Sequence, residues 1–508
     1  MNRILALAAL ATTTLVGCDA QTGSGGETRF VLTSAPPAAP LASASEGDDP
    51  AADLPELQVE ARVHGRVVAG VPAFLDARAS EAADADYRWT CSDGTIAEGA
   101  LTTATFAEAG PVSCTAFAAD DSGQTGATVI DFEVRDTPAK WTLMVFINGD
   151  SDLETAALDD LAEMEMAGSS EDVQVVVQMD RARGYTADEG DWTTARRFLV
   201  GDDLAQAIDT PELEDLGEVD SGDWTTLVDF VDWSVTHFPA ERYGFVIWNH
   251  GEGWKGAEAV EGTGSKAISY DYESGNALSI AGGDLESFLV ETTGLLGGPL
   301  DLLGADACLM QTFEVAWTAA PYADVYVASQ ELEGWDGWSY DTFLPDLMAN
   351  PDMSAAELGE RIATRFQESK DRTQSVIDLA QMDALADALD LLAETLMDSP
   401  EGAAQVLDAA EGAWRSAANK DNRDLGHLLE ALAESSEDPA VLAAVADADN
   451  AFQAAVLTNR TYNYREAIAP DGLSIYVPEL KEVDPLYAKA AWSSELLWDD
   501  MLAQAVSE

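Results

Sequence analysis

The chain has 508 residues, with 93 acidic and 26 basic side chains and a net charge of -67 at pH 7. A charge of this sign repels nucleic-acid phosphates and anionic lipid headgroups, so we expect no nucleic-acid partner. Such a surface is usually solubilising, and the alternative is a role in attracting cationic substrates or calcium. The length exceeds that of one ordinary domain, which predicts a small module joined to a larger, enzyme-sized unit.

The first residues indicate export. Arg3 precedes an apolar run, residues 4–16, that is too short to span a bilayer but fits the hydrophobic core of a signal peptide. The run ends in LVGC, which resembles a bacterial lipobox and implies removal of residues 1–17 and lipidation of Cys18. We therefore expect an envelope protein held to a membrane only through this lipid, with the choice of inner or outer membrane left open. An ordinary signal peptide with an incidental cysteine is the alternative.

Two segments precede the larger unit. Residues 18–55 are rich in Gly, Ser, Ala and Pro, which predicts a disordered tether. Residues 56–136 carry short alternating segments separated by turn residues, which predicts a small β-sandwich. Its YRWTCS strand and its AGPVSCTAFAADDSG stretch resemble the Ig-like PKD modules of many secreted bacterial enzymes. This resemblance implies a spacer or weak-binding role without chemistry.

The cysteines predict one bridge and one free thiol. With Cys18 lipidated, three cysteines remain in an oxidising compartment. We expect Cys91 to pair with Cys114, because Trp89 and Cys91 share a strand face where a bridge can lie beside the indole. Closing this loop of about 24 residues would stabilise the module by roughly 2 to 4 kcal/mol. Cys308 then stays free, and it is either buried and inert or reactive.

The larger unit, residues 139–508, alternates apolar strands with helical patterns. Five runs are almost continuously apolar, as expected for strands covered on both faces: 141–147, 173–179, 243–249, 300–306 and 324–329. Repeated βα units predict an α/β fold with a mostly parallel sheet flanked by helices, and ligands at the carboxyl ends of the strands. Residues 354–457 have helical spacing, and we expect a late strand at 472–478 and a closing helix near 494–505.

Two of these predicted strands run directly into reactive side chains. The strand at 243–249 leads into His250 and Gly251, and the strand at 300–306 leads into Cys308. A thiol nucleophile needs an imidazole that favours its thiolate and later protonates the leaving amine, and it needs backbone N–H groups for the oxyanion. We predict a dyad of His250 and Cys308, with the N–H groups of Gly251 and Cys308 as the oxyanion hole. An inert buried cysteine is the alternative.

The segments FVIWNHGEGW, GADACLMQTFEVAW and VASQELEGWDGWSYDTFL resemble the clostripain family of cysteine peptidases, peptidase family C11. The likeness covers residues 141–505 and implies a caspase-like clan CD fold. It implies that His250 is the general acid and base and that Cys308 is the nucleophile. Asp306 matches the acid that lines the S1 pocket and pairs with Arg or Lys at P1. The alternative for Asp306 is a structural carboxylate at a strand end.

The resemblance also implies self-processing after a basic residue in the loop beyond the catalytic histidine. Lys255 and Lys266 are the only basic residues between His250 and Cys308, and we expect cleavage after Lys266 in its Gly- and Ser-rich surroundings. An ordinary solvated lysine is the alternative.

Calcium dependence is known in this family, and the segment NGDSDLE, residues 148–154, concentrates acids at a strand end. This segment lacks the EF-hand pattern, so the sequence names no metal ligands. The chemistry itself requires no cofactor.

We therefore expect an exported, lipid-anchored cysteine endopeptidase that cleaves proteins or peptides after Arg or Lys through a thioacyl-enzyme. One alternative is a catalytically inactive lipid-anchored binding or scaffold protein that retains the peptidase fold. Another is an enzyme of the same fold with a different P1 preference. If Asp306 is not the pocket acid, Glu331 or Glu333 is the next candidate. The remaining histidines, His64, His237 and His427, are expected to be surface or core residues.

Overall fold

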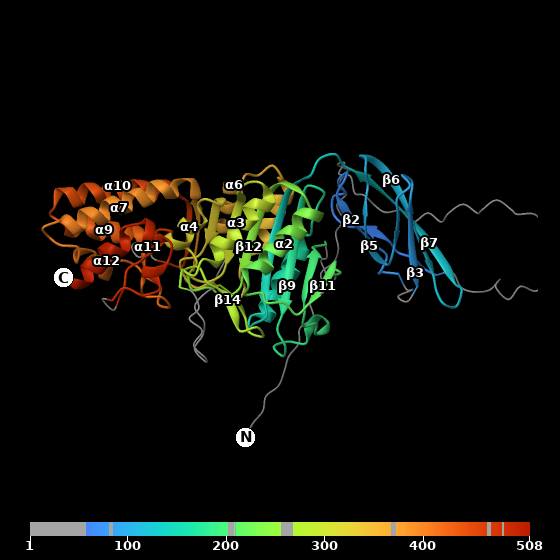
Figure 1. The fold of residues 1–508 in the computed structure, drawn as a ribbon, viewed down its shortest axis with the longest axis horizontal. Coiled ribbons are helices and arrows are strands. Elements are labelled where there is room, and N and C mark those ends of the chain that lie inside the picture. Colours follow the sequence, from blue (N-terminus) through green and yellow to red (C-terminus); the bar gives the residue numbers. More distant parts are fainter. Residues whose placement is uncertain are drawn as a thin grey trace, which may run out of the picture.

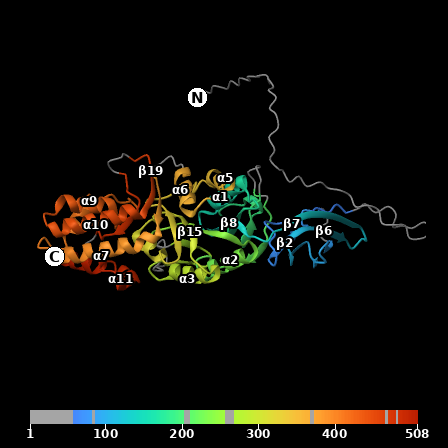
Figure 2. The same cartoon turned by 90° about the horizontal axis from the view of Figure 1, so that it is seen from above.

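The computed structural model describes residues 57–80, 85–201, 208, 210–255, 268–366, 372–464, 469–479 and 482–508. Three parts follow one another along the long axis: a β-sandwich, a central α/β unit and a C-terminal helical region (Figures 1 and 2). The expected lipidation site Cys18 and self-cleavage site Lys266 lie outside the described residues. Within the described ranges, no helix has the length and apolar character needed to cross a bilayer.

The sandwich consists of two antiparallel sheets. The first has the order β1 (Arg62–Val63), β2 (Pro72–Asp76), β5 (Leu101–Thr105), and the second has the order β4 (Ile96–Glu98), β3 (Asp86–Cys91), β6 (Gly110–Ala119), β7 (Thr125–Val134). Alternate residues of β3 and β6 point inward, so Trp89 is fully buried and donates through its indole N–H to the carbonyl of Gly99. Cys91 and Cys114 are cross-strand partners and form a disulfide, with their Cα atoms 4.0 Å apart.

The central unit is built on one nine-stranded sheet with parallel strands at its centre. Its order is β11 (Glu214–Gly217), β10 (Ala195–Leu199), β9 (Val173–Arg181), β8 (Ala139–Gly149), β12 (Ala240–Trp248), β15 (Leu300–Asp306), β16 (Ala323–Ala328), β17 (Arg372–Asp378), β19 (Val456–Tyr462). The five strands from β9 to β16 are parallel, and an antiparallel pair extends each side. This confirms the predicted α/β fold.

Helices cover both faces of this sheet. One face packs against α1 (Glu154–Ala167), α5 (Tyr340–Ala349) and α6 (Ala355–Arg365), and the other packs against α2 (Trp224–His237), α3 (Asp284–Leu296) and α4 (Phe313–Ala319). The side chains of Asp223 and Ser354 cap the first turns of α2 and α6. The strands are therefore buried on both sides, which agrees with their almost unbroken apolar runs.

The C-terminal region is mainly helical. It contains α7 (Met382–Asp398), α8 (Gln405–Gly412), α9 (Leu425–Ser435), α10 (Pro439–Ala455), α11 (Trp492–Glu495) and α12 (Trp498–Ser507). Two small ribbons complete the chain, β13 (Ile268–Asp271) with β14 (Asn276–Leu278) and β18 (Asn422–Asp424) with β20 (Ser474–Tyr476). Short 3₁₀ turns lie at Asp188–Gly190, Leu379–Gln381 and Tyr487–Lys489. The predicted late strand is thus real but pairs outside the main sheet.

The prediction of helical structure over residues 354–457 was wrong for two strands, one before the C-terminal helices and one after them. The segment contains β17, and β19 begins at Val456. Polar residues hide the first strand in the sequence, because Thr373, Gln374 and Ser375 are buried and two of them hydrogen-bond within the core. Such polar strand residues give no apolar run to recognise.

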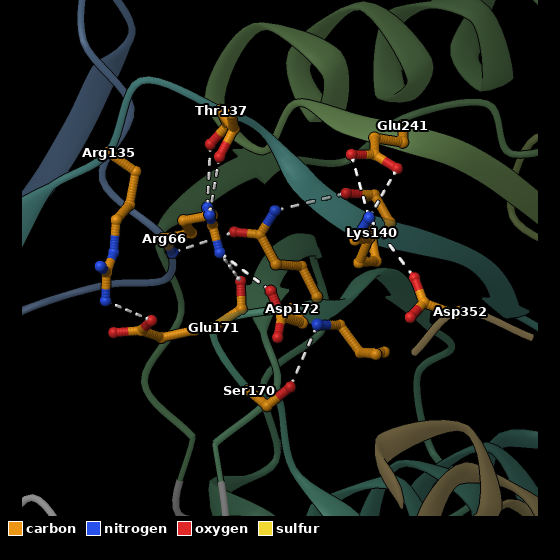
Figure 3. A network of polar contacts seen from close by, with 12 residues as sticks. Arg66, Arg135, Thr137, Lys140, Ser170, Glu171, Asp172, Glu241 and Asp352 are labelled. Carbon is orange, nitrogen blue, oxygen red and sulfur yellow. Dashed lines mark hydrogen bonds and ion pairs between the residues drawn. The ribbon is translucent and has the colours of Figure 1, made fainter. Parts of the chain in front are cut away.

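The sandwich docks at the amino ends of the parallel strands, through the polar contacts seen in Figure 3. Arg66 donates to the carbonyl of Thr137 over 2.9 Å and pairs with Asp172 over 3.0 Å, just before β9 begins. Its backbone N–H donates to the side chain of Gln174. Arg135 pairs with Glu171 over 2.7 Å (Figure 3). Since His250 and Cys308 follow the carboxyl ends of their strands, the sandwich is attached at the opposite edge of the sheet.

The sandwich and the central unit also share an apolar contact, which a simple spacer would not need. Phe74 of β2 belongs to the same buried cluster as the residues of the central unit. Its ring lies 4.6 Å from that of His237 and 6.0 Å from that of Trp233. His237 also bonds through Nδ1 to the carbonyl of Pro72. His237 is therefore a half-buried interface residue, and the sandwich shares its core with the larger unit.

We predict that Phe74→Ala destabilises the whole chain by about 3 to 5 kcal/mol, because it opens a cavity in a shared core. Scanning calorimetry should then separate the sandwich from the rest as an earlier transition. Phe117→Ala is the matched control, since Phe117 lies on the same module but is 42% exposed. Equal effects of the two substitutions would show that the docking contact adds nothing to stability.

Candidate active site

The register of two neighbouring strands sets the positions of the predicted reactive residues. β12 and β15 run parallel, and Trp248 is the cross-strand partner of Asp306. His250 and Cys308 each follow two residues later, so they leave the sheet side by side at its carboxyl edge. The backbone N–H of Asn249 donates to the carbonyl of Asp306 and keeps the two chains together beyond the last paired residues.

Gly251 brings the histidine loop against the cysteine loop. A Cβ added at this glycine would lie 2.5 Å from the carbonyl oxygen of Cys308 and 3.0 Å from the Cβ of Ala307. Any larger residue would push the two loops apart, which explains a glycine directly after His250. Within the described part of the chain, nothing accepts a hydrogen bond from the backbone N–H of Cys308. That N–H is therefore free to bind an oxyanion.

The backbone directly after the thiol has an uncommon conformation. Leu309 has a φ of 64°, in the left-handed region that a branched side chain seldom occupies. Its side chain is buried and its N–H donates to the carbonyl of Glu331 over 3.1 Å, which holds this conformation in place. Strained backbone of this kind is concentrated at functional sites, where the surrounding structure maintains it.

Asp152 is a site residue that the sequence did not assign. Its Oδ1 accepts a hydrogen bond from Nε2 of His250 over 2.8 Å and another from the hydroxyl of Tyr272 over 3.0 Å. Partial burial would raise the pKa of Asp152, but the hydrogen bonds and the charge of His250 outweigh it and hold this pKa below its usual value. The contact occupies Nε2 of His250, and Nδ1 is its second ring nitrogen. The acidic segment 148–154 contained this signal, although we considered it only in relation to calcium.

The thiol of Cys308 lies in a largely buried environment. Burial raises its pKa, and the backbone N–H of Glu333, which donates to Sγ over 3.2 Å, partly offsets this. The nearby charges of Asp306 and Glu331 raise the pKa further. The thiol is therefore protonated in the resting protein and needs a base to become a nucleophile.

Asp306 lies at the end of β15 in a group of buried carboxyls. Its Oδ2 accepts from the hydroxyl of Tyr340 over 2.9 Å and from the N–H of Trp338 over 3.2 Å. Asp160 faces it from α1, and its Oδ2 accepts from the indole of Trp248. A Cβ at Gly337 would lie 2.8 Å from Oδ2 of Asp160 and 3.3 Å from Oδ1 of Asp306, so both carboxyls pack closely against this glycine.

Glu333 joins this group from the loop after β16. Its carboxyl interacts with that of Asp306, and its Oε2 is buried without a hydrogen-bond partner among the described residues. Burial raises the pKa of Asp306 to about 6, while hydrogen bonds from Glu333, Trp338 and Tyr340 oppose the rise. Burial and the nearby Asp306 raise the pKa of Glu333 well above its usual value. The two buried acids therefore bind a proton more readily than solvent-exposed carboxyls do.

No cation balances these acids within the described part of the chain. None of Asp160, Asp306 and Glu333 forms an ion pair there. Unpaired buried carboxyls are costly in free energy, and the arrangement is relieved by a proton or by a cation that enters from outside. Of the two reserve candidates for the pocket acid, Glu333 belongs to this group. Glu331 instead accepts from the hydroxyl of Ser416.

The other residues singled out in the sequence lie away from this chemistry. Lys255 is largely buried and pairs with Asp421 over 2.9 Å. His64 contacts Asp76 inside the sandwich, and Nδ1 of His427 accepts from the backbone N–H of Trp414 in the helical region. These contacts agree with structural roles for both histidines.

The fold and these contacts define a class: an α/β protein that presents an imidazole and a thiol on adjacent parallel strands above a buried acidic group. The model of the clostripain family matches residues 145–504, most of the chain. The chain therefore belongs to the clostripain family, as its motifs predicted.

Individual relatives agree with this membership. Clostripain of Hathewaya histolytica is 28% identical over 230 residues, which are 41% of this chain and 42% of that protein, so the match spans less than half of the curated relative. A secreted C11 cysteine protease of Bacteroides thetaiotaomicron, solved with an irreversible peptide inhibitor, has a TM-score of 0.52 at 19% identity, over 72% of this chain and 99% of that one. An inactive zymogen C11 protease of Parabacteroides distasonis has a TM-score of 0.53 at 22% identity, over 73% and 99%. At these identities the two structures establish a common fold.

Proposed function

We propose that this protein is an exported cysteine endopeptidase that hydrolyses peptide bonds after Arg or Lys through His250 and Cys308. The observation that carries the proposal is the register of β12 and β15, which sets an imidazole and a thiol on adjacent strand ends in a member of the clostripain family. Such a pairing is what acyl transfer by a thiol requires.

The proposed reaction begins with transfer of the thiol proton of Cys308 to Nδ1 of His250. The thiolate attacks the scissile carbonyl carbon, and the backbone N–H groups of Cys308 and Gly251 stabilise the oxyanion. The imidazolium then protonates the leaving amine, and a thioacyl-enzyme remains. Water attacks this thioester while His250 takes its proton, and the acid product leaves with regeneration of the thiol.

In this scheme Asp152 is a positioning residue. Its bond to Nε2 fixes the ring of His250, leaves Nδ1 as the proton-accepting nitrogen and stabilises the imidazolium that forms. The raised pKa of Cys308 keeps the thiol neutral until His250 takes its proton.

A basic P1 side chain supplies the positive charge that the buried acidic group lacks. Asp306 lies two residues before the nucleophile, and Asp160 packs against the same glycine, Gly337. In the proposed complex a guanidinium or ammonium group of the substrate approaches Asp306 and forms charge-assisted hydrogen bonds with it. The proposed preference for Arg or Lys follows from this gain.

The location and processing of the enzyme rest on sequence features. We propose that the chain is lipid-anchored through Cys18 in the bacterial envelope, and that it is cut after Lys266. The ion pair of Lys255 with Asp421 and the low exposure of Lys255 disfavour cleavage there, which supports the choice of Lys266.

We predict that Cys308→Ala or His250→Ala lowers kcat/KM by about 10⁴ or more, because a catalytic dyad acts as one unit. Asp152→Asn should lower it by about 10 to 100-fold, since the imidazolium loses the negative charge of its partner but the ring stays in place. The assay is hydrolysis of a peptide with Arg at P1, with circular dichroism to verify the fold.

Tyr272→Phe is the matched control for Asp152→Asn. It removes the second hydrogen bond to the same carboxylate and leaves the contact with His250, so activity should fall less than about threefold. Wild-type rates for Asp152→Asn would refute the positioning role, and retained activity in both dyad variants would refute the dyad.

We predict that Asp306→Asn lowers kcat/KM for Arg and Lys substrates by about 10² or more, through loss of about 3 kcal/mol of charge-assisted binding. In the unsubstituted enzyme, kcat/KM for these substrates should fall as the pH drops through about 6, because protonated Asp306 cannot pair with a cation. Substrates with an uncharged P1 residue should lack this acid limb. Parallel pH profiles on two peptides that differ only at P1 measure the effect.

Glu331→Gln is the control for this specificity test, because Glu331 carries the same charge near Cys308 but belongs to a different hydrogen-bond network. It should keep the preference for basic P1 residues. If the Asp306→Asn enzyme still prefers Arg, Asp306 is not the pocket acid. Glu333→Gln is then the variant to examine.

A further inference from the structure

A second group of acids lies at the same edge of the sheet, and the catalytic scheme does not use it. Asp150 follows β8, Asp180 lies at the end of β9, Glu218 follows β11, and Asp271 ends β13. Each offers one carboxylate oxygen, and these oxygens all lie within 4.8 Å of one another. Asp150, Asp180 and Asp271 are at most 2% exposed, whereas Glu218 faces solvent.

This group is short of hydrogen-bond donors and of positive charge. Oδ1 of Asp150, a residue only 1% exposed, is buried without a hydrogen-bond partner among the described residues. The other oxygens of the three buried acids each accept one bond. Asp180 accepts from the N–H of Arg181 and from Ser221 Oγ, Asp271 from the N–H of Ser221 and of Ser274, and Oδ2 of Asp150 from the N–H of Glu273. In the described ranges, none of the four acids has an ion-pair partner. A buried carboxylate oxygen without a hydrogen-bond donor, among other acids, indicates that the group binds a positively charged ligand.

The donor set determines the class of cation. All four groups are carboxylates, which are hard oxygen ligands, and the set contains no thiol or imidazole that would favour zinc or copper. Two oxygens bound to one Ca²⁺ at 2.3 to 2.6 Å can lie up to about 5 Å apart, so the spacing of the group is compatible with one ion. Carboxylates from four separate segments also suit the irregular geometry of Ca²⁺ better than the strict octahedron of Mg²⁺.

We propose that Asp150, Asp180, Glu218 and Asp271 bind one Ca²⁺ ion, and that this ion holds the segment carrying Asp152 against His250. The link to His250 rests on the proposed function, whereas the binding of the ion rests on the four carboxylates themselves.

The coupling to the catalytic residues runs through two short segments. Asp152 lies two residues after Asp150, and Tyr272 directly follows Asp271. The backbone N–H of Tyr272 donates to the carbonyl of Asp150 over 2.9 Å, and its hydroxyl donates to Oδ1 of Asp152. An ion that binds both Asp150 and Asp271 therefore fixes the two segments that follow them. These segments carry Asp152, which accepts the hydrogen bond of His250, and Tyr272, which donates to Asp152.

Calcium binding is measured on the full exported chain carrying Cys308→Ala, so the outcome does not depend on peptidase activity. Isothermal titration calorimetry should give one site, with Ca²⁺ at least tenfold tighter than Mg²⁺. Saturating Ca²⁺ should raise Tm by about 3 °C or more relative to chelator, because the ion binds only the folded chain. Asp150→Asn and Asp180→Asn should each weaken Ca²⁺ binding at least tenfold and remove the Tm rise.

Asp471→Asn is the matched control. Asp471 belongs to a second group, with Asp424 and His427, in the helical region, and its loss should leave the Ca²⁺ titration unchanged. The proposed site is wrong if Ca²⁺ does not bind, if Mg²⁺ binds equally well, or if only Asp471→Asn removes binding.

The coupling to His250 is tested separately on the chain with Cys308 intact. The pH profile for alkylation of Cys308 by iodoacetamide should move to higher pH when calcium is chelated, because a displaced Asp152 no longer supports the imidazolium. If the pH profile is the same with calcium bound and with calcium removed, the ion does not position Asp152. Failure of peptide cleavage alone would leave the binding result intact.

Discussion

The parallel pairing of β12 with β15 is the constraint on which the rest of the site depends. Because Trp248 and Asp306 are cross-strand partners, the two chains leave the carboxyl edge of the sheet at the same level. His250 and Cys308 thereby become neighbours although 58 positions separate them in the sequence. Gly251 permits the close approach of the two loops, and the left-handed backbone at Leu309 turns the chain away directly after the thiol.

Negative charge at this edge is the second organising feature. One acidic group, with the buried Asp160 and Asp306, lies beneath the cysteine, and another, with the buried Asp150 and Asp180, lies beyond Asp152 on the histidine side. Neither group has a cationic partner among the described residues. Burial without compensation destabilises the fold, so such groups are expected where a substrate or ion completes the structure. The large excess of acids in the chain is thus partly organised into sites, in addition to any solubilising role.

The sequence predicted the framework of the fold because its strands are unbroken apolar runs that end in polar residues. The same pattern placed His250 and Cys308 at strand ends, and the motifs around them indicated the family. Asp152 escaped notice because its role depends on the pairing of β8 with β12, two strands from distant parts of the chain. β17 escaped because three of its buried residues, Thr373, Gln374 and Ser375, are polar, and the hydrogen bonds of Thr373 and Ser375 form only in the folded chain.

The docking of the sandwich could not be read from sequence either. Phe74 lies between the buried apolar residues Ala73 and Leu75, as an ordinary core residue of a small module would, and nothing in that pattern shows that it faces α2. The contact makes the sandwich part of the body that supports the amino ends of the catalytic strands. Its attachment opposite the reactive edge leaves that edge open to polypeptide substrates.

The measurement that tests the central claim most directly is a cleavage-site profile on a diverse peptide library, with the Cys308→Ala chain as the blank. The account predicts cuts after Arg and Lys that are absent from the blank, with the residue on the carboxyl side of the bond largely unrestricted. Cuts that persist in the blank, or a profile dominated by acidic or neutral residues at P1, would contradict it.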